Sequence, residues 1–222
     1  MFDVPIPTVP ILNGGAFPVR RIFCVGKNYA DHVREMGGDP QDTPPVFFTK
    51  PADAVSAAPE IRYPLATENL HFEGELVVAL KAGGERLSED EARTCLFGIA
   101  AGCDLTRRDL QAAAKKAGGP WDTAKALDDG AVLGPIAPVD EAPAEGFLRT
   151  RVNGELRQDG RLEDMIWPVP ALIAKLSEYF ELKAGDLVFT GTPEGVGAIG
   201  PGDAVTVEIE GCAPCAFGVV PR

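Results

Sequence analysis

Two glutamates, Glu73 and Glu75, lie at the start of an otherwise apolar stretch, HFEGELVVAL at residues 71–80. Successive side chains of a strand point to opposite faces, so both glutamates would share one face with Val77 and Ala79. Because the stretch becomes apolar on both faces, we expect a strand that is covered on both sides. Two neighbouring buried carboxylates each cost several kcal/mol unless a positive charge lies between them. The rest of the sequence must therefore supply a positive group at this position.

A third carboxylate, Asp104, follows an apolar run in GIAAGCDLTRRDLQ, residues 98–111. We expect a strand that ends at Asp104 and a helix that begins near Thr106, a junction where functional residues are common. Three carboxylates without a paired His or Cys make an oxygen-ligand site, which favours Mg²⁺ or Mn²⁺ over Zn²⁺. Alternatively, Asp104 caps the turn and the two glutamates pair with basic residues. Spacing alone does not separate these two interpretations.

A possible general base lies in NYADHVREM, residues 28–36, which we expect to form a short helix. His32 and Glu35 would then lie one turn apart on the same face, where the carboxylate could orient the imidazole. Such a pair can take a proton from water. The alternative is an exposed His–Glu pair on a surface helix. The only other histidine, His71, is interpreted as a structural residue or as one that supports the site.

Short strands and helices alternate along the chain and must position these residues. Asn153-Gly154 within residues 148–158 predicts a hairpin with a type I′ turn. Strands are also expected at residues 21–25, 46–49 and 203–211. Helices are expected at 88–96, where Ser88 and Glu91 form a capping box, at about 107–117, where Thr106 and Asp109 have the same spacing, and at 170–181.

Composition limits the possible partners and location. A chain of 222 residues that is 45% hydrophobic can form one main domain, and its 25 Gly and 20 Pro suit turn-rich β structure. A net charge of −12 argues against nucleic acid or an anionic membrane as a partner, although a small anionic substrate is compatible with local cations. The five cysteines suggest a reducing cytoplasm, and no secretory signal or membrane-length apolar run is present.

Several stretches together resemble the fumarylacetoacetate hydrolase superfamily, in its single-domain acylpyruvate hydrolase branch. They cover nearly everything from residue 20 onward, and DLTRRDLQ and PWDTAKALD are most similar to the fumarylpyruvate hydrolases. The stretches are RIFCVGKNYADHVREMG, PVFFTKPADAV, HFEGELVVAL, GCDLTRRDLQ, PWDTAKALDDGAVLGP, RVNGELRQ and LVFTGTPEGVG.

The resemblance implies a β-rich α+β fold, a mixed β-roll or sandwich with short flanking helices, assembled as a homodimer. Residues 1–19 would be an N-terminal arm and residues 20–222 a single catalytic domain. It also implies a role for each matching residue: Glu73, Glu75 and Asp104 bind Mg²⁺ or Mn²⁺; His32 and Glu35 activate water; Lys125 lines the site; and Arg108, Gln111 and Thr192 contact the substrate. Lys50 matches a further lysine, whose role stays open between substrate binding and structure.

The resemblance further implies a hydrolase of aromatic catabolism that cleaves a carbon–carbon bond in acylpyruvates, converting fumarylpyruvate to fumarate and pyruvate. An oxaloacetate decarboxylase would share the carboxylates and needs no attacking water. An isomerase of 2-oxo dienoic acids would use the metal with different acid–base groups, and the His32–Glu35 pair favours hydrolysis over it. The alternative outside enzymology is a metal-dependent protein that binds keto acids without turnover.

Overall fold

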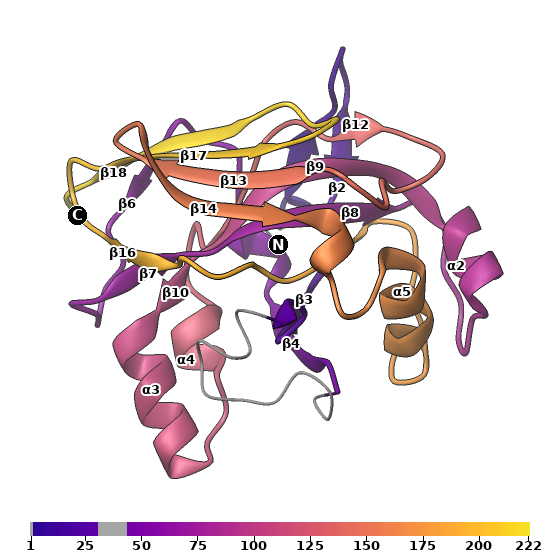
Figure 1. Ribbon diagram of the computed structural model, residues 1–222, viewed down its shortest axis with the longest axis horizontal. Coiled ribbons are helices and arrows are strands. Elements are labelled where there is room, and N and C mark those ends of the chain that lie inside the picture. The colour runs from indigo at the N-terminus through magenta and orange to yellow at the C-terminus, as the bar shows by residue number, and fades with distance from the viewer. Residues whose placement is uncertain (1, 31–43) are drawn as a thin grey trace.

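In the computed structural model, residues 2–30 and 44–222 are described, and most of the regular structure in them consists of strands (Figure 1). The largest sheet has the order β4-β3-β15-β8-β9-β11-β5, with β12 paired to β9, and it contains parallel and antiparallel neighbours. Its strands are β3 (Arg21–Gly26), β4 (Val46–Lys50), β5 (Val55–Ser56), β8 (Gly74–Leu80), β9 (Leu96–Asp104), β11 (Ala131–Leu133), β12 (Ala137–Pro138) and β15 (Asp186–Phe189).

Three smaller sheets complete the strand structure. A five-stranded sheet packs on the largest one and has the order β14-β13-β17-β18-β6. Its strands are β6 (Glu60–Arg62), β13 (Phe147–Val152), β14 (Glu155–Arg161), β17 (Ala204–Ile209) and β18 (Cys215–Val220). The other two sheets are β10-β7-β16, with β7 (Leu70–Phe72), β10 (Thr106–Arg107) and β16 (Gly197–Ile199), and the hairpin of β1 (Thr8–Pro10) and β2 (Ala16–Pro18).

Short helices flank the sheets at two ends. Helices α3 (Arg108–Ala117) and α4 (Asp122–Lys125) lie together at one end, and α2 (Glu89–Thr94) and α5 (Val169–Ser177) lie together at the other (Figure 1). Two single 3₁₀ turns are η2 (Ala52–Ala54), between β4 and β5, and η3 (Leu162–Asp164), between β14 and α5. The structure confirms the predicted fold class, which is β-rich α+β with short flanking helices.

Strand β8 divides the apolar core into two clusters. Leu76, Val78 and Leu80 belong to a large cluster that reaches the five-stranded sheet and α5. Val77 and Ala79 point the other way, into a smaller cluster enclosed by β3, β9, β11 and β15. Every residue of β8 is buried, as expected for a strand covered on both sides. Glu75 has the same parity as Val77, so it lies on the side of the smaller cluster.

The single strand that we expected at 71–80 is interrupted at Glu73. Strand β7 ends at Phe72 and pairs with β10 and β16, whereas β8 begins at Gly74 and pairs with β9 and β15. The neighbouring strand changes sheet at the same level, because β9 ends at Asp104 and β10 begins at Thr106. The Asp104 N–H donates a hydrogen bond of 2.8 Å to the Glu73 carbonyl across this junction. The two acids therefore lie where a pair of strands passes from one sheet to the other.

The helices expected at 88–96, 107–117 and 170–181 form, with differences at their ends. The Ser88–Glu91 capping box of α2 is confirmed. The proposed cap of α3 is wrong, because Thr106 belongs to β10 and the Asp109 carboxylate accepts hydrogen bonds from Thr67 Oγ1 and the Glu68 N–H. Helix α5 ends at Ser177 rather than at residue 181, since the chain continues there as turns.

Other local predictions are confirmed or fall outside the described part of the chain. Strands β3, β4 and β17 occupy the predicted positions. Asn153 and Gly154 connect β13 to β14 with φ angles of 53° and 81°, as a type I′ turn requires. Of the helix expected at 28–36, only residues 28–30 are described.

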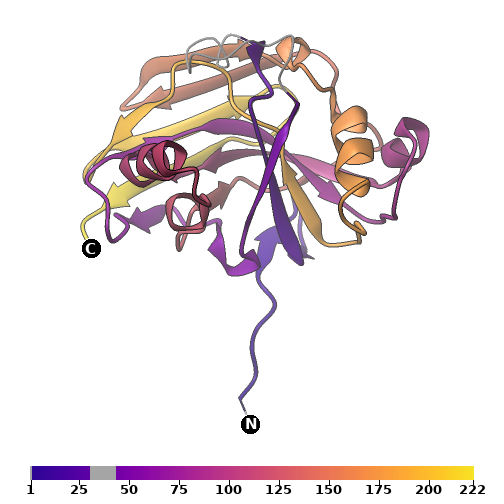
Figure 2. The same ribbon diagram turned by 90° about the horizontal axis from the view of Figure 1, so that it is seen from below.

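The segment interpreted as an N-terminal arm has two parts. Residues 2–7 extend away from the sheets (Figure 2), and Phe2, Val4 and Ile6 are exposed. Residues 8–18 instead form the β1–β2 hairpin, whose Val9 and Phe17 are buried in the smaller core cluster. Among the residues that the structure describes, no helix is long and apolar enough to span a membrane.

The close approach of the two main sheets at Gly74 predicts a stability defect. A Cβ at position 74 would overlap Thr150 Oγ1 and lie 3.1 Å from Gln158 Oε1. Overpacking of this kind costs about 1–3 kcal/mol, so Gly74→Ala should unfold at lower urea concentration than the wild type. Gly200→Ala is the matched control, because a Cβ there meets nothing within 4 Å. Equal midpoints for the two variants would contradict this account.

Candidate metal-dependent active site

The sheet junction brings the three predicted carboxylates together. One oxygen from each of Glu73, Glu75 and Asp104 lies within 4.8 Å of the others. Their exposed fractions are 6%, 2% and 0%, so the cluster is buried. Asp104 lies beside Glu73 because β9 pairs with β8 in antiparallel register. The sequence prediction that these three acids meet is confirmed by the geometry.

Two buried lysines neutralise part of this charge. Lys125 Nζ, at the end of α4, lies 2.8 Å from Glu73 Oε2 and 2.7 Å from Asp104 Oδ2. Lys50 Nζ, at the end of β4, lies 2.8 Å from Asp104 Oδ1 and donates to the carbonyls of Leu105 and Lys125. Burial opposes the charge of Lys125, but Asp104 and Glu73 outweigh it and raise the pKa of Lys125. The site therefore holds two ammonium groups against two of its carboxylates.

Glu75 is held in a different way. Its Oε2 accepts a hydrogen bond of 2.8 Å from the Gly191 N–H, and no ion pair to Glu75 occurs among the described residues. Gly191 has a φ of +100°, and a Cβ there would lie 2.8 Å from Asn28 Cβ, so glycine is required for this contact. Burial, then repulsion by Asp104 and Glu73, raises the pKa of the Glu75 carboxyl well above its usual range.

Arg108 connects the carboxylates to α3. Its guanidinium pairs with Glu73 Oε1, donates to Gln111 Oε1 at 2.6 Å, and donates through Nε to His71 Nδ1 at 3.3 Å. His71 Nε2 is 3.0 Å from Asn69 Oδ1, so its hydrogen faces Asn69. Burial, followed by the charge of Arg108, lowers the pKa of His71 to about 4. His71 is therefore a neutral residue that positions Arg108, in agreement with its predicted supporting role.

A buried glutamine that the sequence reasoning missed links the site to the second sheet. Gln158 accepts from the Gly74 N–H at 3.0 Å and donates to Thr192 Oγ1 at 2.8 Å and to the Pro193 carbonyl at 2.9 Å. Thr192 in turn donates its hydroxyl hydrogen to the Gly74 carbonyl. The sequence offered one signal for this role. Gln158 stands between the charged residues Arg157 and Asp159 on β14, and since these two are exposed, strand alternation directs Gln158 inward.

A pocket opens beside the carboxylates. Lys125 Nζ lies 4.9 Å from the centroid of the Phe48 ring, and Phe48 packs against Trp121 at 5.7 Å between centroids. Lys50 lies behind Asp104 and does not line this pocket. The lining includes Glu73, Glu75, Phe48, Arg108, Gln111, Trp121, Lys125 and Thr192.

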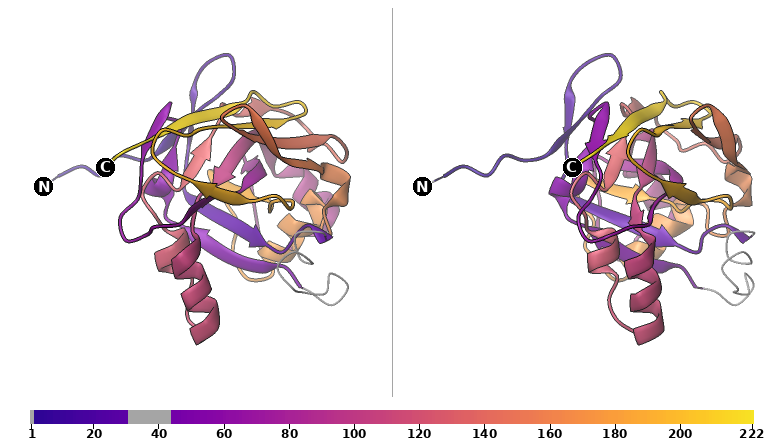
Figure 3. Two further views of the ribbon diagram at one scale, coloured as in Figure 1. Left: turned by 60° about the vertical axis from the view of Figure 1, so that its left-hand side comes forward. Right: turned by 90° about the vertical axis from the view of Figure 1, so that its left-hand side faces the viewer.

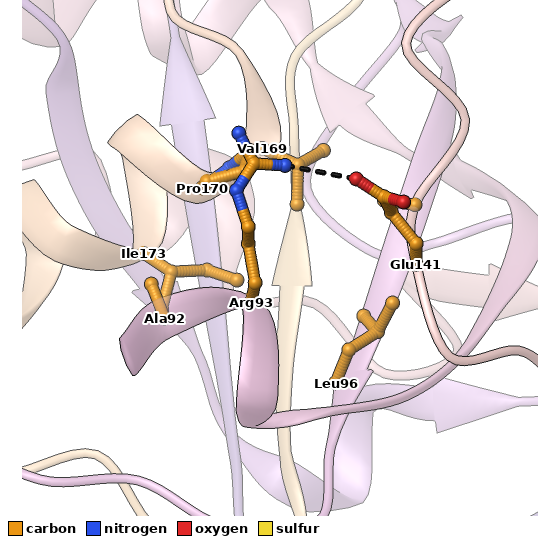
Figure 4. Close-up of a pocket in the computed structure, with 8 residues that line it drawn as sticks. Ala92, Arg93, Leu96, Glu141, Val169, Pro170 and Ile173 are labelled. Carbon is orange, nitrogen blue, oxygen red and sulfur yellow. Dashed lines mark hydrogen bonds and ion pairs between the residues drawn. The ribbon is translucent and has the colours of Figure 1, made fainter. Parts of the chain in front are cut away.

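A separate hollow between α2 and α5 lacks these features (Figure 4). Its lining is largely apolar and includes Leu96, Val169 and Ile173. The ion pair between Arg93 and Glu141 at its edge is 3.0 Å long and exposed. Among the described residues, the only group of acidic, His or Cys side chains close enough to hold a metal is the carboxylate triad.

The structure thus brings eight predicted site residues to one place, namely Glu73, Glu75, Asp104, Lys125, Lys50, Arg108, Gln111 and Thr192. The predicted base and its partner, His32 and Glu35, lie outside the described residues. Three carboxylates within 4.8 Å of one another, two of which line a pocket, fit a hard divalent cation, because oxygen ligands of this kind suit Mg²⁺ and Mn²⁺. The pairing of the glutamates with basic residues, which we considered as an alternative, is present at Glu73, but no ion pair to Glu75 occurs among the described residues.

Comparison with known proteins agrees with this geometry. The model of the fumarylacetoacetate (FAA) hydrolase C-terminal family matches residues 21–220. The chain belongs to the fumarylacetoacetate hydrolase family. Among family members, the fumarylpyruvate hydrolase of a Ralstonia species is 44% identical over 177 residues, which are 79% of this chain and 92% of that protein. The oxaloacetate tautomerase YcgM of Escherichia coli strain K12 is 42% identical over 202 residues, which are 88% of this chain and 90% of that protein.

Solved structures of the family show the same fold. The crystal structure of fumarylpyruvate hydrolase from Pseudomonas aeruginosa in complex with Mn²⁺ and pyruvate has a TM-score of 0.97 and 42% identity to this chain. The similarity covers 100% of this chain and 99% of that one. The predicted family and its fold are therefore confirmed.

The charge at Glu75 predicts opposite effects on stability and on metal binding. A raised folded-state pKa stabilises the protein below the ordinary carboxyl pKa, and this stability is lost as the pH rises through the raised value. In chelator at pH 8, Glu75→Gln should therefore have a higher Tm than the wild type, by about 2–4 °C for each kcal/mol. The difference should shrink towards pH 5. Added Mg²⁺ should raise the Tm of the wild type and leave that of Glu75→Gln unchanged.

The matched control for this prediction is Glu85→Gln, because Glu85 is exposed. It should follow the wild type at every pH and respond to Mg²⁺ as the wild type does. A Glu75→Gln protein that Mg²⁺ stabilises as strongly as the wild type would show that Glu75 is not needed to bind the ion.

Proposed function

We propose that the protein is a metal-dependent hydrolase that cleaves the carbon–carbon bond of an acylpyruvate, with fumarylpyruvate as substrate and fumarate and pyruvate as products. The observation that carries this proposal is the buried triad of Glu73, Glu75 and Asp104 beside a pocket that also contains cations. The fumarylpyruvate hydrolases among the relatives, one of them solved with Mn²⁺ and pyruvate, support it.

In this proposal, Glu73, Glu75 and Asp104 hold one divalent cation, Mg²⁺ or Mn²⁺. When bound, the ion would polarise the 2-oxo acid end of the substrate and stabilise negative charge that develops there. Its positive charge would also supply the cation that Glu75 lacks among the described residues. Lys50 and Lys125 would keep the side chains of Asp104 and Glu73 in place.

The chain's own residues would bind and orient the substrate. Lys125 stays protonated because its pKa is raised, so its ammonium can stabilise an oxyanion beside Glu73. Arg108 and Gln111 line the pocket, and their mutual hydrogen bond fixes the direction of the guanidinium. Thr192 would form part of the wall, since its hydroxyl hydrogen is directed to Gly74.

We assign the activation of water to His32, with Glu35 as its partner. The assignment comes from the family resemblance and from the spacing of the two residues. The structure adds one argument, which is that the only other histidine is unsuited to the task. The pKa of His71 is lowered to about 4, and both of its ring nitrogens have partners. A neutral imidazole that accepts from Arg108 cannot also accept a proton from water.

A second candidate activity is the tautomerisation of oxaloacetate. It is favoured by the oxaloacetate tautomerases among the relatives, one of which is 42% identical over 88% of this chain. Both reactions pass through negative charge on a 2-oxo acid, so both would use the triad and Lys125. They differ in water, since only hydrolysis consumes it. The oxaloacetate decarboxylase considered from the sequence differs from the hydrolase in the same way.

Further properties are proposals that rest on the family resemblance and on composition. They are Mg²⁺ as the resident ion, assembly as a homodimer, a place in aromatic catabolism and a cytoplasmic location. The proposed substrate, a small anionic 2-oxo acid, suits a pocket that contains cations in a protein whose net charge is −12.

Turnover assays test the hydrolase proposal. With Mg²⁺, the protein should release pyruvate from fumarylpyruvate, chelator should abolish this activity, and Mn²⁺ should restore it. His32→Ala should lower kcat by roughly 10²-fold or more, the scale of general-base catalysis, while calorimetry should show that oxalate still binds with the metal. If the pH–rate profile of the wild type has an acid limb near neutrality, His71→Asn should show the same limb at the same pH, because His71 does not titrate there.

The same preparation should be tested with oxaloacetate, by following loss of its enol and release of CO₂. The proposed function requires a higher kcat/KM for fumarylpyruvate than for either reaction of oxaloacetate. If oxaloacetate is the better substrate, the tautomerase or the decarboxylase assignment replaces the hydrolase.

A further inference from the structure

One face of α3 carries a series of polar side chains towards the pocket. Arg108, Gln111 and Lys115 are spaced at i, i+3 and i+7, so they lie on one side of the helix. All three line the pocket. Arg108 is at the end that contacts the carboxylates, and Lys115 is about 10 Å further along the axis, from a rise of ~1.5 Å per residue. Helix α3 extends away from the sheets, which places Lys115 towards the outer end (Figures 1 and 3).

Lys115 contacts the pocket wall and has no ion pair among the described residues. Its Nζ lies 5.3 Å from the centroid of the Trp121 ring, a cation–π contact that restricts the ammonium. No ion pair to Lys115 occurs within the described residues, in contrast to Arg108 and Lys125. Partial burial and repulsion from Arg108 lower its pKa, although Glu73 opposes this shift. An ammonium that lies beside other cations and has no ion pair within the described part of the chain can attract an anion.

Lys27 adds a second positive charge to the same pocket. It follows the end of β3, has a φ of +65° and lines the pocket with Lys115. Lys27 also has no ion pair among the residues described. The deep part of the pocket thus holds carboxylates and the cations paired with them, whereas the rim holds two ammonium groups that form no ion pair with any described residue. A ligand that fits both parts would have one acidic group that reaches the proposed divalent cation in the deep part and a second acidic group at the rim.

We propose that Lys115, assisted by Lys27, binds the distal carboxylate of the substrate's acyl group and makes the pocket selective for dicarboxylic acylpyruvates. This inference rests on the proposed function, which places the 2-oxo acid end at the carboxylate triad. The distal carboxylate of an extended fumarylpyruvate would then reach the rim. Oxaloacetate ends about three carbon–carbon bonds earlier and would leave Lys115 without a partner. An acylpyruvate with a neutral acyl group would gain nothing from this lysine.

A pair of uncleavable probes tests this inference without turnover. 2-Oxopimelate and 2-oxoheptanoate have carbon chains of equal length, and only 2-oxopimelate ends in a second carboxylate. Calorimetry on the Mg²⁺-loaded protein should show that the wild type binds 2-oxopimelate more tightly by roughly five- to tenfold, between the values for exposed and for enclosed ion pairs. Lys115→Met should abolish this preference and leave the affinity for 2-oxoheptanoate unchanged.

The matched control is Lys116→Met. Lys116 is the next residue of the last turn of α3, is exposed and does not line the pocket, so this variant should keep the full preference. Unchanged Tm values for both variants will show that each is folded. Equal affinity of the wild type for the two probes, or an undiminished preference in Lys115→Met, would overturn the inference.

Turnover provides a second readout that separates this inference from the proposed function. Lys115→Met should raise KM for fumarylpyruvate by roughly five- to tenfold, with little change in kcat and no change with acetylpyruvate, whose acyl group is neutral. An equal loss with both substrates would contradict a role in binding the distal carboxylate. If no acylpyruvate is cleaved while the probe preference and its loss in Lys115→Met are observed, the proposed function fails and the binding site stands.

Discussion

The structure depends on the concentration of negative charge at the point where two paired strands leave one sheet for another. Glu73 and Asp104 lie at this junction, and Glu75 follows at the start of β8. Three buried carboxylates at this spacing would repel one another strongly if nothing compensated them. Two buried lysines from other elements, Lys50 of β4 and Lys125 of α4, neutralise the carboxylates of Asp104 and Glu73. The third, Glu75, accepts a hydrogen bond from the Gly191 N–H and has no ion pair among the described residues, an imbalance that suits a divalent cation.

Much of the surrounding fold serves to hold this junction rigid. Because Gly74 has no side chain, the five-stranded sheet approaches closely enough for Gln158 to form hydrogen bonds with both Gly74 and Thr192. Gln158 thereby links the start of β8 to the loop after β15. Gly191 lets the same loop present its N–H to Glu75. On the open side, α3 carries cations outward from the carboxylates to the rim. The protein thus separates a deep end suited to metal chelation from an outer end suited to a second carboxylate.

The sequence predicted what depends on local pattern, and missed what depends on distant contacts. The buried strand that carries Glu75, the Ser88 capping box and the Asn153-Gly154 turn each follow from a few adjacent residues, and each is confirmed. The break between β7 and β8 at Glu73 could not be predicted from the sequence, because the two strands have one continuous apolar pattern. They differ only in the strands with which they pair. Two contacts join distant parts of the chain. Lys50 pairs with Asp104, which is 54 positions away, and Gln158 accepts a hydrogen bond from Gly74, which is 84 positions away. No local sequence pattern predicts such pairs. The Thr106 cap failed because the partners of Asp109 come from residues 67 and 68.

We propose that the triad of Glu73, Glu75 and Asp104 forms a single binding site for a divalent cation. It is tested most directly by titrating Mn²⁺ into the metal-free protein and following the electron paramagnetic resonance signal of the free ion. The account predicts one Mn²⁺ per chain for the wild type and for Asp140→Asn, an exposed control. Asp104→Asn should weaken binding by at least about tenfold, because it removes one of three anionic ligands and leaves Lys50 and Lys125 with less negative charge beside them. Wild-type stoichiometry and affinity in Asp104→Asn would contradict the account.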